Sequence, residues 1–187
     1  QALQPGCRVT AVEFPGHGAT GKPPEPWGVP EFAGWLQTMM SQLGLHRPTV
    51  VAHSFGGRVA LWLAAEHPDI FARMVLTGAA GIRRAKTPEE ERKEAHYKKT
   101  RQRLEQFTGL PLVGGLAQEM LRRARDKRSS PDYLEADEDM KQTFVRVISQ
   151  DLAPMLHKVQ VPALLVWGDR DNATPLWMGR QMRSEER

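Results

Sequence analysis

The sequence contains one cysteine, Cys7, among its 187 residues. A single cysteine cannot form an internal disulfide, so a reducing, cytoplasmic location is expected. No apolar run approaches the roughly 20 residues of a membrane-spanning helix, and no signal peptide is visible, so no membrane association is expected. His, Cys and carboxylate residues nowhere show the spacing of metal ligands, and we therefore expect neither a metal nor another cofactor.

A concentrated charge of one sign is also missing. The chain has 26 Lys and Arg against 22 Asp and Glu, and its net charge of +4 falls in residues 82–150. The basic residues there alternate with glutamates and lack the glycine and aromatic pattern of RNA-binding segments, so a solvated helix surface is predicted and no nucleic-acid partner is expected. An anion-binding module built on this region is a weaker alternative. Nothing in the sequence indicates an oligomeric state.

Residues 48–57, Pro-Thr-Val-Val-Ala-His-Ser-Phe-Gly-Gly, combine a short apolar strand with a turn around Ser54. An apolar helical run, residues 58–65, follows immediately. The small residues Ala52 and Gly56 flank the serine, which we interpret as space for strand and helix backbones that nearly touch. The start of the helix would also direct N–H groups and a partial positive charge at an anion on the serine.

This segment resembles the nucleophile elbow of the α/β-hydrolase family, except that Ala52 stands where the family has glycine. The resemblance implies that Ser54 is a catalytic nucleophile and that the backbone N–H of Phe55 is an oxyanion donor. Two histidines, His17 in a Pro-Gly-His-Gly turn and His53 beside the serine, are candidates for the rim of a pocket. His53 is a poor base for Ser54 because successive side chains of a strand point to opposite sides.

A second family segment comes near the end of the chain. The apolar strand Val161–Trp167 is followed by a loop with glycine, two aspartates and proline, residues 168–175. By resemblance this loop places the catalytic acid at Asp171, with Asp169 as the competing candidate. A structural role, capping the next helix, remains the alternative for both carboxylates.

The expected fold is α/β: a mostly parallel sheet with flanking helices, incomplete relative to the family, and a helical lid inserted into it. We predict one part of the α/β core with the serine turn at 1–81, the lid at 82–152, and a second core part with the acid loop at 153–187. The expected strands are Arg8–Phe14, one ending at 50–51, Arg73–Thr77 and Val161–Trp167. The expected helices start at Pro30, just after Ser54, near Pro88, near Leu112 and at Ser130–Pro131.

A serine nucleophile needs a base, and the family order along the chain is serine, acid, histidine. All six histidines precede Asp171, and His157 is expected at the far end of the acid strand. A second oxyanion donor is not located either. The sequence therefore predicts an internal fragment of a hydrolase of roughly 250–300 residues, inactive by itself.

The leading functional hypothesis is an esterase-like serine hydrolase that acts on a small or moderately hydrophobic molecule. Other chemistries of the same family, C–C bond hydrolysis, aminopeptidase and cofactor-free haloperoxidase activity, remain open. A non-catalytic binding protein that keeps the pocket without the base is the alternative from another class.

Overall fold

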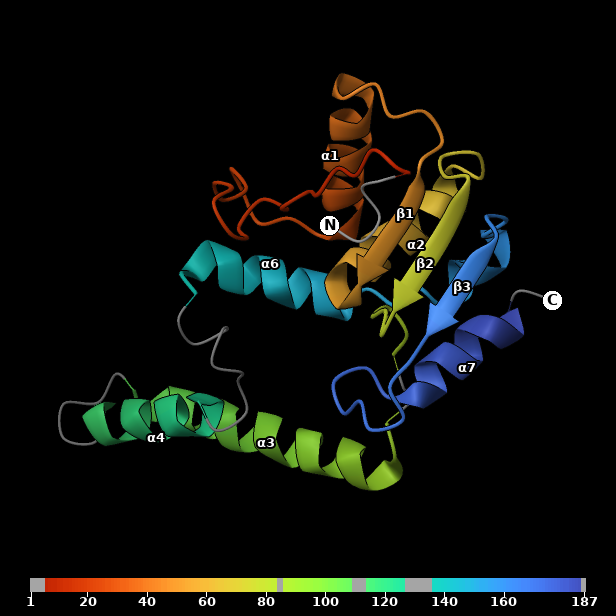
Figure 1. The fold of residues 1–187 in the computed structure, drawn as a ribbon. Coiled ribbons are helices and arrows are strands. Elements are labelled where there is room, and N and C mark those ends of the chain that lie inside the picture. Colours follow the sequence, from red (N-terminus) through yellow and green to blue (C-terminus); the bar gives the residue numbers. More distant parts are fainter. Residues whose placement is uncertain (1–5, 84–85, 109–113, 127–135, 186–187) are drawn as a thin grey trace. The chain divides into compact units, whose positions relative to one another are not determined.

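The computed structural model describes residues 6–83, 86–108, 114–126 and 136–185. Three strands and several helices alternate along the chain, as expected for an α/β protein (Figure 1). The elements in order are α1 (Val29–Gln42), β1 (Thr49–His53), α2 (Ser54–Glu66), β2 (Arg73–Thr77), α3 (Pro88–Phe107), α4 (Gly114–Asp126), α6 (Glu138–Ser149), the 3₁₀ helix η1 (Ala153–Lys158), β3 (Ala163–Val166) and α7 (Leu176–Glu185).

The sheet is parallel, with the strand order β1-β2-β3. Its register pairs Val51 with Val75, and Val75 with Leu164. In a parallel sheet all strands end at the same edge. The loops that follow β1, β2 and β3 therefore leave from one edge, where ligand sites of α/β proteins usually lie. This architecture confirms the predicted fold class.

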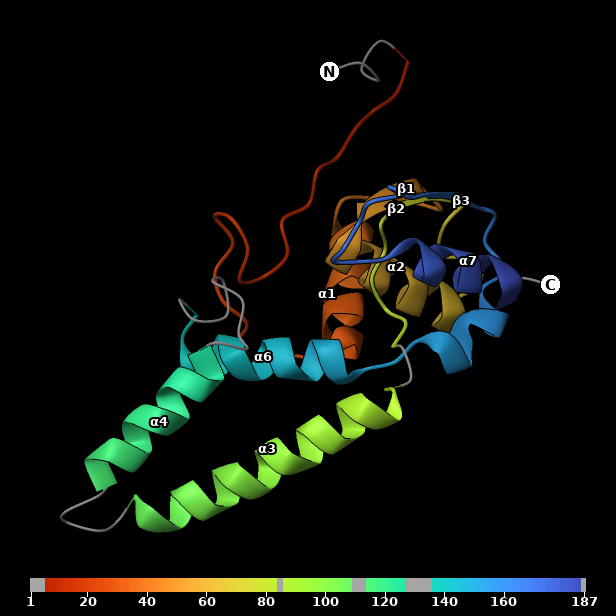
Figure 2. The same ribbon diagram turned by 90° about the horizontal axis from the view of Figure 1, so that it is seen from below.

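Helices α1, α2 and α7 lie on one side of the sheet (Figure 2). Their apolar residues and the inward residues of β2 form the core, with Met74 and Leu76 at most 1% exposed. The residues that point to the other side of the strands are exposed, among them Val51 and Leu164. None of the helices in the described ranges has the length and hydropathy to span a bilayer.

The predicted strand Arg8–Phe14 is not a strand in the structure. These residues run without a ladder partner, and β1 pairs with β2 alone among the described residues. A strand is stabilised by bonds from its N–H and C=O groups to a neighbour, so an extended segment without one is not a strand. Only its end is anchored, where Phe14 packs against Phe32 and Phe55.

Helix α6 belongs to the same compact unit as the sheet, which comprises residues 1–83 and 138–187. The helical spacing of its segment predicts an apolar face of Tyr133, which lies outside the described residues, Met140, Phe144 and Val147 or Ile148. In the structure Thr143 and Val147 are buried, whereas Phe144 and Ile148 are 42% and 45% exposed. The buried face thus includes the polar Thr143, whose hydroxyl accepts a hydrogen bond from the backbone N–H of Trp27 at 3.0 Å. The predicted helix start at Ser130–Pro131 lies outside the described residues.

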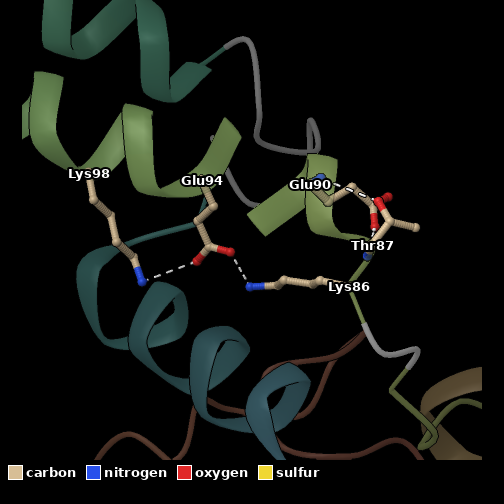
Figure 3. A network of polar contacts seen from close by, with 5 residues as sticks. All are labelled: Lys86, Thr87, Glu90, Glu94 and Lys98. Atoms are coloured by element: carbon tan, nitrogen blue, oxygen red, sulfur yellow. Dashed lines mark hydrogen bonds and ion pairs between the residues drawn. The ribbon is translucent and has the colours of Figure 1, made fainter. Parts of the chain in front are cut away.

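Residues 84–137 form a second compact unit, which contains α3 and α4. No residue of α3 is buried, so caps and ion pairs stabilise the helix beside its contacts with α4. Thr87 and Glu90 form a capping box, and Glu94 pairs with Lys86 and with Lys98 at 3.2 Å (Figure 3). The segment 82–152, predicted as a lid, is thus divided between the two compact units, with α6 in the unit of the sheet; its role as a lid stays a prediction.

Candidate active site

Ser54 occupies the junction between β1 and α2. Its φ is +46°, in the left-handed region that residues other than glycine rarely adopt, while the preceding His53 is still extended. The chain therefore turns abruptly at the serine, from the last strand residue into the first helical residue. Such backbone strain is typical of functional positions, and it occurs here at the serine that the sequence singled out.

Gly57, three residues after the serine, packs tightly against Ala79 of the loop after β2. A Cβ on Gly57 would lie 2.5 Å from the Cβ of Ala79, closer than two non-bonded carbons can approach. At Gly56, the glycine that the sequence emphasised, an added Cβ would make an ordinary 3.7 Å contact with the Ala52 methyl. The Ala80 N–H also donates to the Ser54 carbonyl at 3.0 Å. The loop after β2 therefore holds the serine turn from behind.

The expected oxyanion donor, the backbone N–H of Phe55, belongs to the first turn of α2. The first four N–H groups of a helix have no partner within the helix and lie at the positive end of its dipole. The Phe55 ring is fixed by Phe32, with ring centroids 4.9 Å apart. His17, predicted at the pocket rim, stacks on the same ring at 5.4 Å, with the planes 10° apart. An aromatic cluster thus sets the position of the residue that carries the donor.

The Asp171 carboxylate is held by its own loop. One oxygen accepts from the N–H groups of Ala173 and Thr174 at 2.9 and 2.8 Å, and the other accepts from the Thr174 hydroxyl at 2.8 Å. The hydrogen bonds from Thr174, with a smaller one from Ala173, hold the pKa of the Asp171 carboxyl below its usual range, although partial burial opposes the shift. The carboxylate therefore stays ionised near neutral pH. Asp169, the competing candidate, is exposed.

The bonds between Asp171 and Thr174 join the two ends of the turn before α7. Asp171 stabilises the turn that leads into α7 through these bonds. This is the structural role that the sequence left as the alternative to catalysis. The two roles are compatible, because a carboxylate that is fixed by its loop is also positioned to accept a bond from another side chain.

Gly78 lies between the acid and His53. A Cβ at Gly78 would lie 3.0 Å from Asp171 Oδ2 and 3.6 Å from His53 Cε1, and its φ of +48° also favours glycine. The His53 Nδ1–H donates to the Thr77 carbonyl at 2.8 Å, because a carbonyl can only accept. His53 therefore turns toward β2 and the acid loop, away from Ser54 on the next pleat.

The three residues after β2 connect the two halves of the site. Gly78 faces the acid loop, and Ala80 bonds to the serine turn. Ser54 and Asp171 therefore leave the sheet at the same edge, on either side of this loop. His157 lies in η1, before the start of β3, and so at the opposite edge.

Sequence reasoning did not assign roles to Gly57, Gly78 or Arg58. A glycine directly after a predicted strand is a weak signal for a close approach, but the partner atoms come from elsewhere in the chain.

Within the ranges that the structure describes, no three His, Cys, Asp or Glu side chains gather as a metal site would require.

The comparisons with known proteins concern the family and the fold. A family model described as alpha/beta hydrolase fold matches residues 1–185. An uncharacterised protein of Mycobacterium tuberculosis is 35% identical over 74 residues, which is 40% of this chain and 22% of that protein. A 2-hydroxy-6-oxononadienedioate/2-hydroxy-6-oxononatrienedioate hydrolase of Pseudomonas sp. is 24% identical over 194 residues, which is 95% of this chain and 65% of the hydrolase.

Among solved structures, a meta-cleavage product hydrolase of Pseudomonas fluorescens IP01 superposes with a TM-score of 0.62 at 21% identity. The match covers 98% of this chain and 69% of that one. At this identity the superposition shows the fold alone. The chain spans less than two thirds of the length of both curated relatives.

Proposed function

This chain belongs to the α/β-hydrolase fold family, and on that premise we propose that the protein that carries it is a serine hydrolase with Ser54 as nucleophile. The observation that supports the proposal most is the left-handed backbone of Ser54 at the strand–helix junction. This conformation is costly for serine, and it places the residue at the first turn of α2, where the N–H groups have no partner within the helix.

In the proposed reaction, Ser54 Oγ attacks the carbonyl carbon of an acyl substrate while a base removes its proton. The carbonyl oxygen becomes an oxyanion, which the Phe55 N–H and the dipole of α2 stabilise. The intermediate collapses, expels the alcohol with the returned proton, and leaves an acyl-serine. A water molecule, deprotonated by the same base, then releases the acid and restores the hydroxyl.

We propose Asp171 as the residue that orients the base. Its hydrogen bonds to Ala173 and Thr174 keep it ionised and fixed. No histidine follows Asp171 within the 187 residues, so we propose that the base comes from sequence outside them. The chain covers only part of the length of its relatives, which supports a base from added sequence. The 187-residue chain is then expected to be inactive alone.

A fluorophosphonate probe, which attaches to an activated serine, tests the assignment. The coding sequence extended on both sides should give a protein that the probe labels at Ser54, and Ser54→Ala should abolish labelling. Ser41→Ala, at an exposed serine of α1, is the matched control and should label like the wild type. A folded extended protein without a Ser54 adduct contradicts the proposal, as does ester hydrolysis that persists in Ser54→Ala.

The name of the Pseudomonas sp. relative favours a second candidate substrate class, 2-hydroxy-6-oxo acids. Hydrolysis of such an acid can be measured beside hydrolysis of a short ester. A kcat/KM for the acid far above that for the ester assigns the chain to this class, and the reverse assigns it to the esterases. Absence of both activities in a labelled protein points to other acyl substrates.

A further inference from the structure

Arg58 is a buried cation on the helix that carries the serine. It lies four residues, about one helical turn, after Ser54 and is 7% exposed. A guanidinium is rarely buried unless its N–H groups are paired, because burial removes its hydration. The partners of Arg58 therefore decide what this position does.

Those partners are two carbonyls at the C-terminal end of α6, one in its last turn and one just after its last residue, Ser149. Nη1 of Arg58 donates to the carbonyl of Val147, and also to the carbonyl of Gln150 at 3.0 Å. The last four carbonyls of a helix have no partner within it and form the negative end of its dipole. Arg58 thus caps α6 with a side chain that comes from α2, 89 residues earlier in the sequence.

Burial lowers the pKa of the Arg58 guanidinium; among the neighbouring charges Arg83 adds to this effect and Asp151 opposes it. Arg58 forms no carboxylate bond in the contacts described. The Asp151 carboxylate favours the cation electrostatically, and it accepts from the N–H groups of Arg83 and Ala153 at 3.1 and 3.2 Å. Arg83 itself donates to the Ser149 carbonyl at 3.1 Å. Two arginines therefore share the C-terminal end of α6, but only Arg58 comes from the serine helix.

The rest of α6 is fastened to the segment that leads into α1. The Val29 N–H donates to the side chain of Gln150 at 2.5 Å, and Arg146 donates to the Pro26 carbonyl at 2.6 Å. These bonds hold α6 in place at this side of the core. Among the described contacts, Arg58 is the side chain that joins α6 directly to α2 by hydrogen bonds.

We propose that Arg58 is a positioning residue, which sets the placement of α2 against α6 and thereby the placement of the Ser54 hydroxyl and the Phe55 N–H. The inference rests on the proposed function for its effect on chemistry. Its physical basis is that acyl transfer requires the nucleophile and the oxyanion donor in one geometry, and that a shift of about 1 Å can cost about 100-fold in rate. Without Arg58, the Gln150 carbonyl loses this donor, the Val147 carbonyl keeps the bond from the Gln150 N–H at 3.3 Å, and the two helices can shift.

The test compares Arg58→Met, Arg58→Lys and the control Arg146→Met in the extended protein. Met retains most of the length of Arg without the donors, and Arg146→Met removes a cation that also bonds α6 to a carbonyl but not to α2. We expect Arg58→Met to lower the fluorophosphonate labelling rate at Ser54 about 10- to 100-fold, with the final labelled fraction near one. Lys, which can donate to one carbonyl at a time, should recover part of the rate, and Arg146→Met should label like the wild type.

The rate and the labelled fraction separate positioning from folding. A merely structural role lowers the fraction of protein that can be labelled and leaves the rate of the folded fraction unchanged, which would overturn the inference. Equal slowing in Arg146→Met would also overturn it, because the effect would then not pass through α2. If Arg58→Met does not fold, the same comparison is made with Arg58→Lys.

Amide hydrogen exchange gives a readout that does not need activity. Arg58→Met, or Arg58→Lys in its place, should speed exchange both in α2 after Arg58 and in the last turn of α6, whereas Arg146→Met should leave α2 unchanged. If the wild type is folded but never labels, the proposed function fails; exchange in α2 then still decides whether Arg58 joins the two helices. Unchanged exchange in α2 of Arg58→Met overturns the link itself.

Discussion

The two faces of the three-stranded sheet are built from similar residues but have opposite environments. On the face toward α1, α2 and α7, Met74 and Leu76 are almost completely buried. On the other face Val51 and Leu164 are 64% and 60% exposed. The register places Val51, Val75 and Leu164 in one row across the strands, so the open face carries a continuous apolar row.

Strand composition therefore predicts a parallel sheet, but it does not predict which face of the sheet is covered by helices. Parallel sheets normally have both faces buried, and their strands are therefore apolar on both sides. The sequence of β3, Ala-Leu-Leu-Val, predicted such a strand, yet alternate residues are exposed in the described structure. The open face thus has the composition of a buried surface.

The largest expected effect comes from truncating the covered face. Leu76→Ala removes a side chain that is 0% exposed and should lower the free energy of unfolding by about 2–5 kcal/mol. The matched Val51→Ala on the open face should cost less than about 1 kcal/mol, because water already contacts that side chain. Urea unfolding of both variants measures the difference. Equal losses would show that the open face is covered in solution.

A second comparison concerns the two glycines behind the serine turn. Gly57→Ala forces a methyl against Ala79 and should destabilise the protein by about 1–3 kcal/mol. Gly56→Ala has room for the methyl and removes a flexible residue from a helix, so it should be neutral or stabilising by up to about 1 kcal/mol. Urea unfolding measures the stability change of both variants. A Gly56→Ala variant that loses more stability than Gly57→Ala would contradict the packing described here.

A third, smaller effect depends on pH and on the acid loop at the carboxyl edge. The pKa of Asp171 is lowered in the folded protein, so its contribution to stability is complete above the ordinary Asp pKa of about 3.9 and is lost as the pH falls through the folded value. Asp171→Asn cannot lose a charge in this range. The thermal midpoint of the wild type should therefore fall more steeply below about pH 4 than that of Asp171→Asn. Parallel curves for the two proteins would show that the carboxylate is not held as described.

The smallest effect on stability is expected for Val51→Thr, a nearly isosteric change on the open face. It should alter the unfolding free energy by about 0.5 kcal/mol or less, since surface substitutions are mostly within this range. Binding of a hydrophobic dye should nevertheless fall, because the apolar row is interrupted. The same substitution in the extended protein sharpens the comparison: a large loss there, and none in the 187-residue chain, would mean that added sequence covers this face.

The local parts of the fold could be predicted from the sequence. The apolar runs gave the positions of β1, β2 and β3, and the turn around Ser54 gave the start of α2. These predictions needed only local patterns.

The long-range parts could not be predicted in this way. Arg8–Phe14 has the composition of a strand, but whether it pairs depends on a neighbour. The bond from Arg58 to Val147 joins residues that no local pattern relates, and the same is true of the bond from Trp27 to the buried Thr143 of α6. Such features depend on which segments meet in three dimensions.

Helix α3 has no buried residue, and it is stabilised by its contacts with α4, its capped start and its ion pairs (Figure 3). Exposed substitutions on such a helix change stability little, provided that the cap at Thr87 is kept. Mutations can therefore accumulate along α3 without unfolding the sheet.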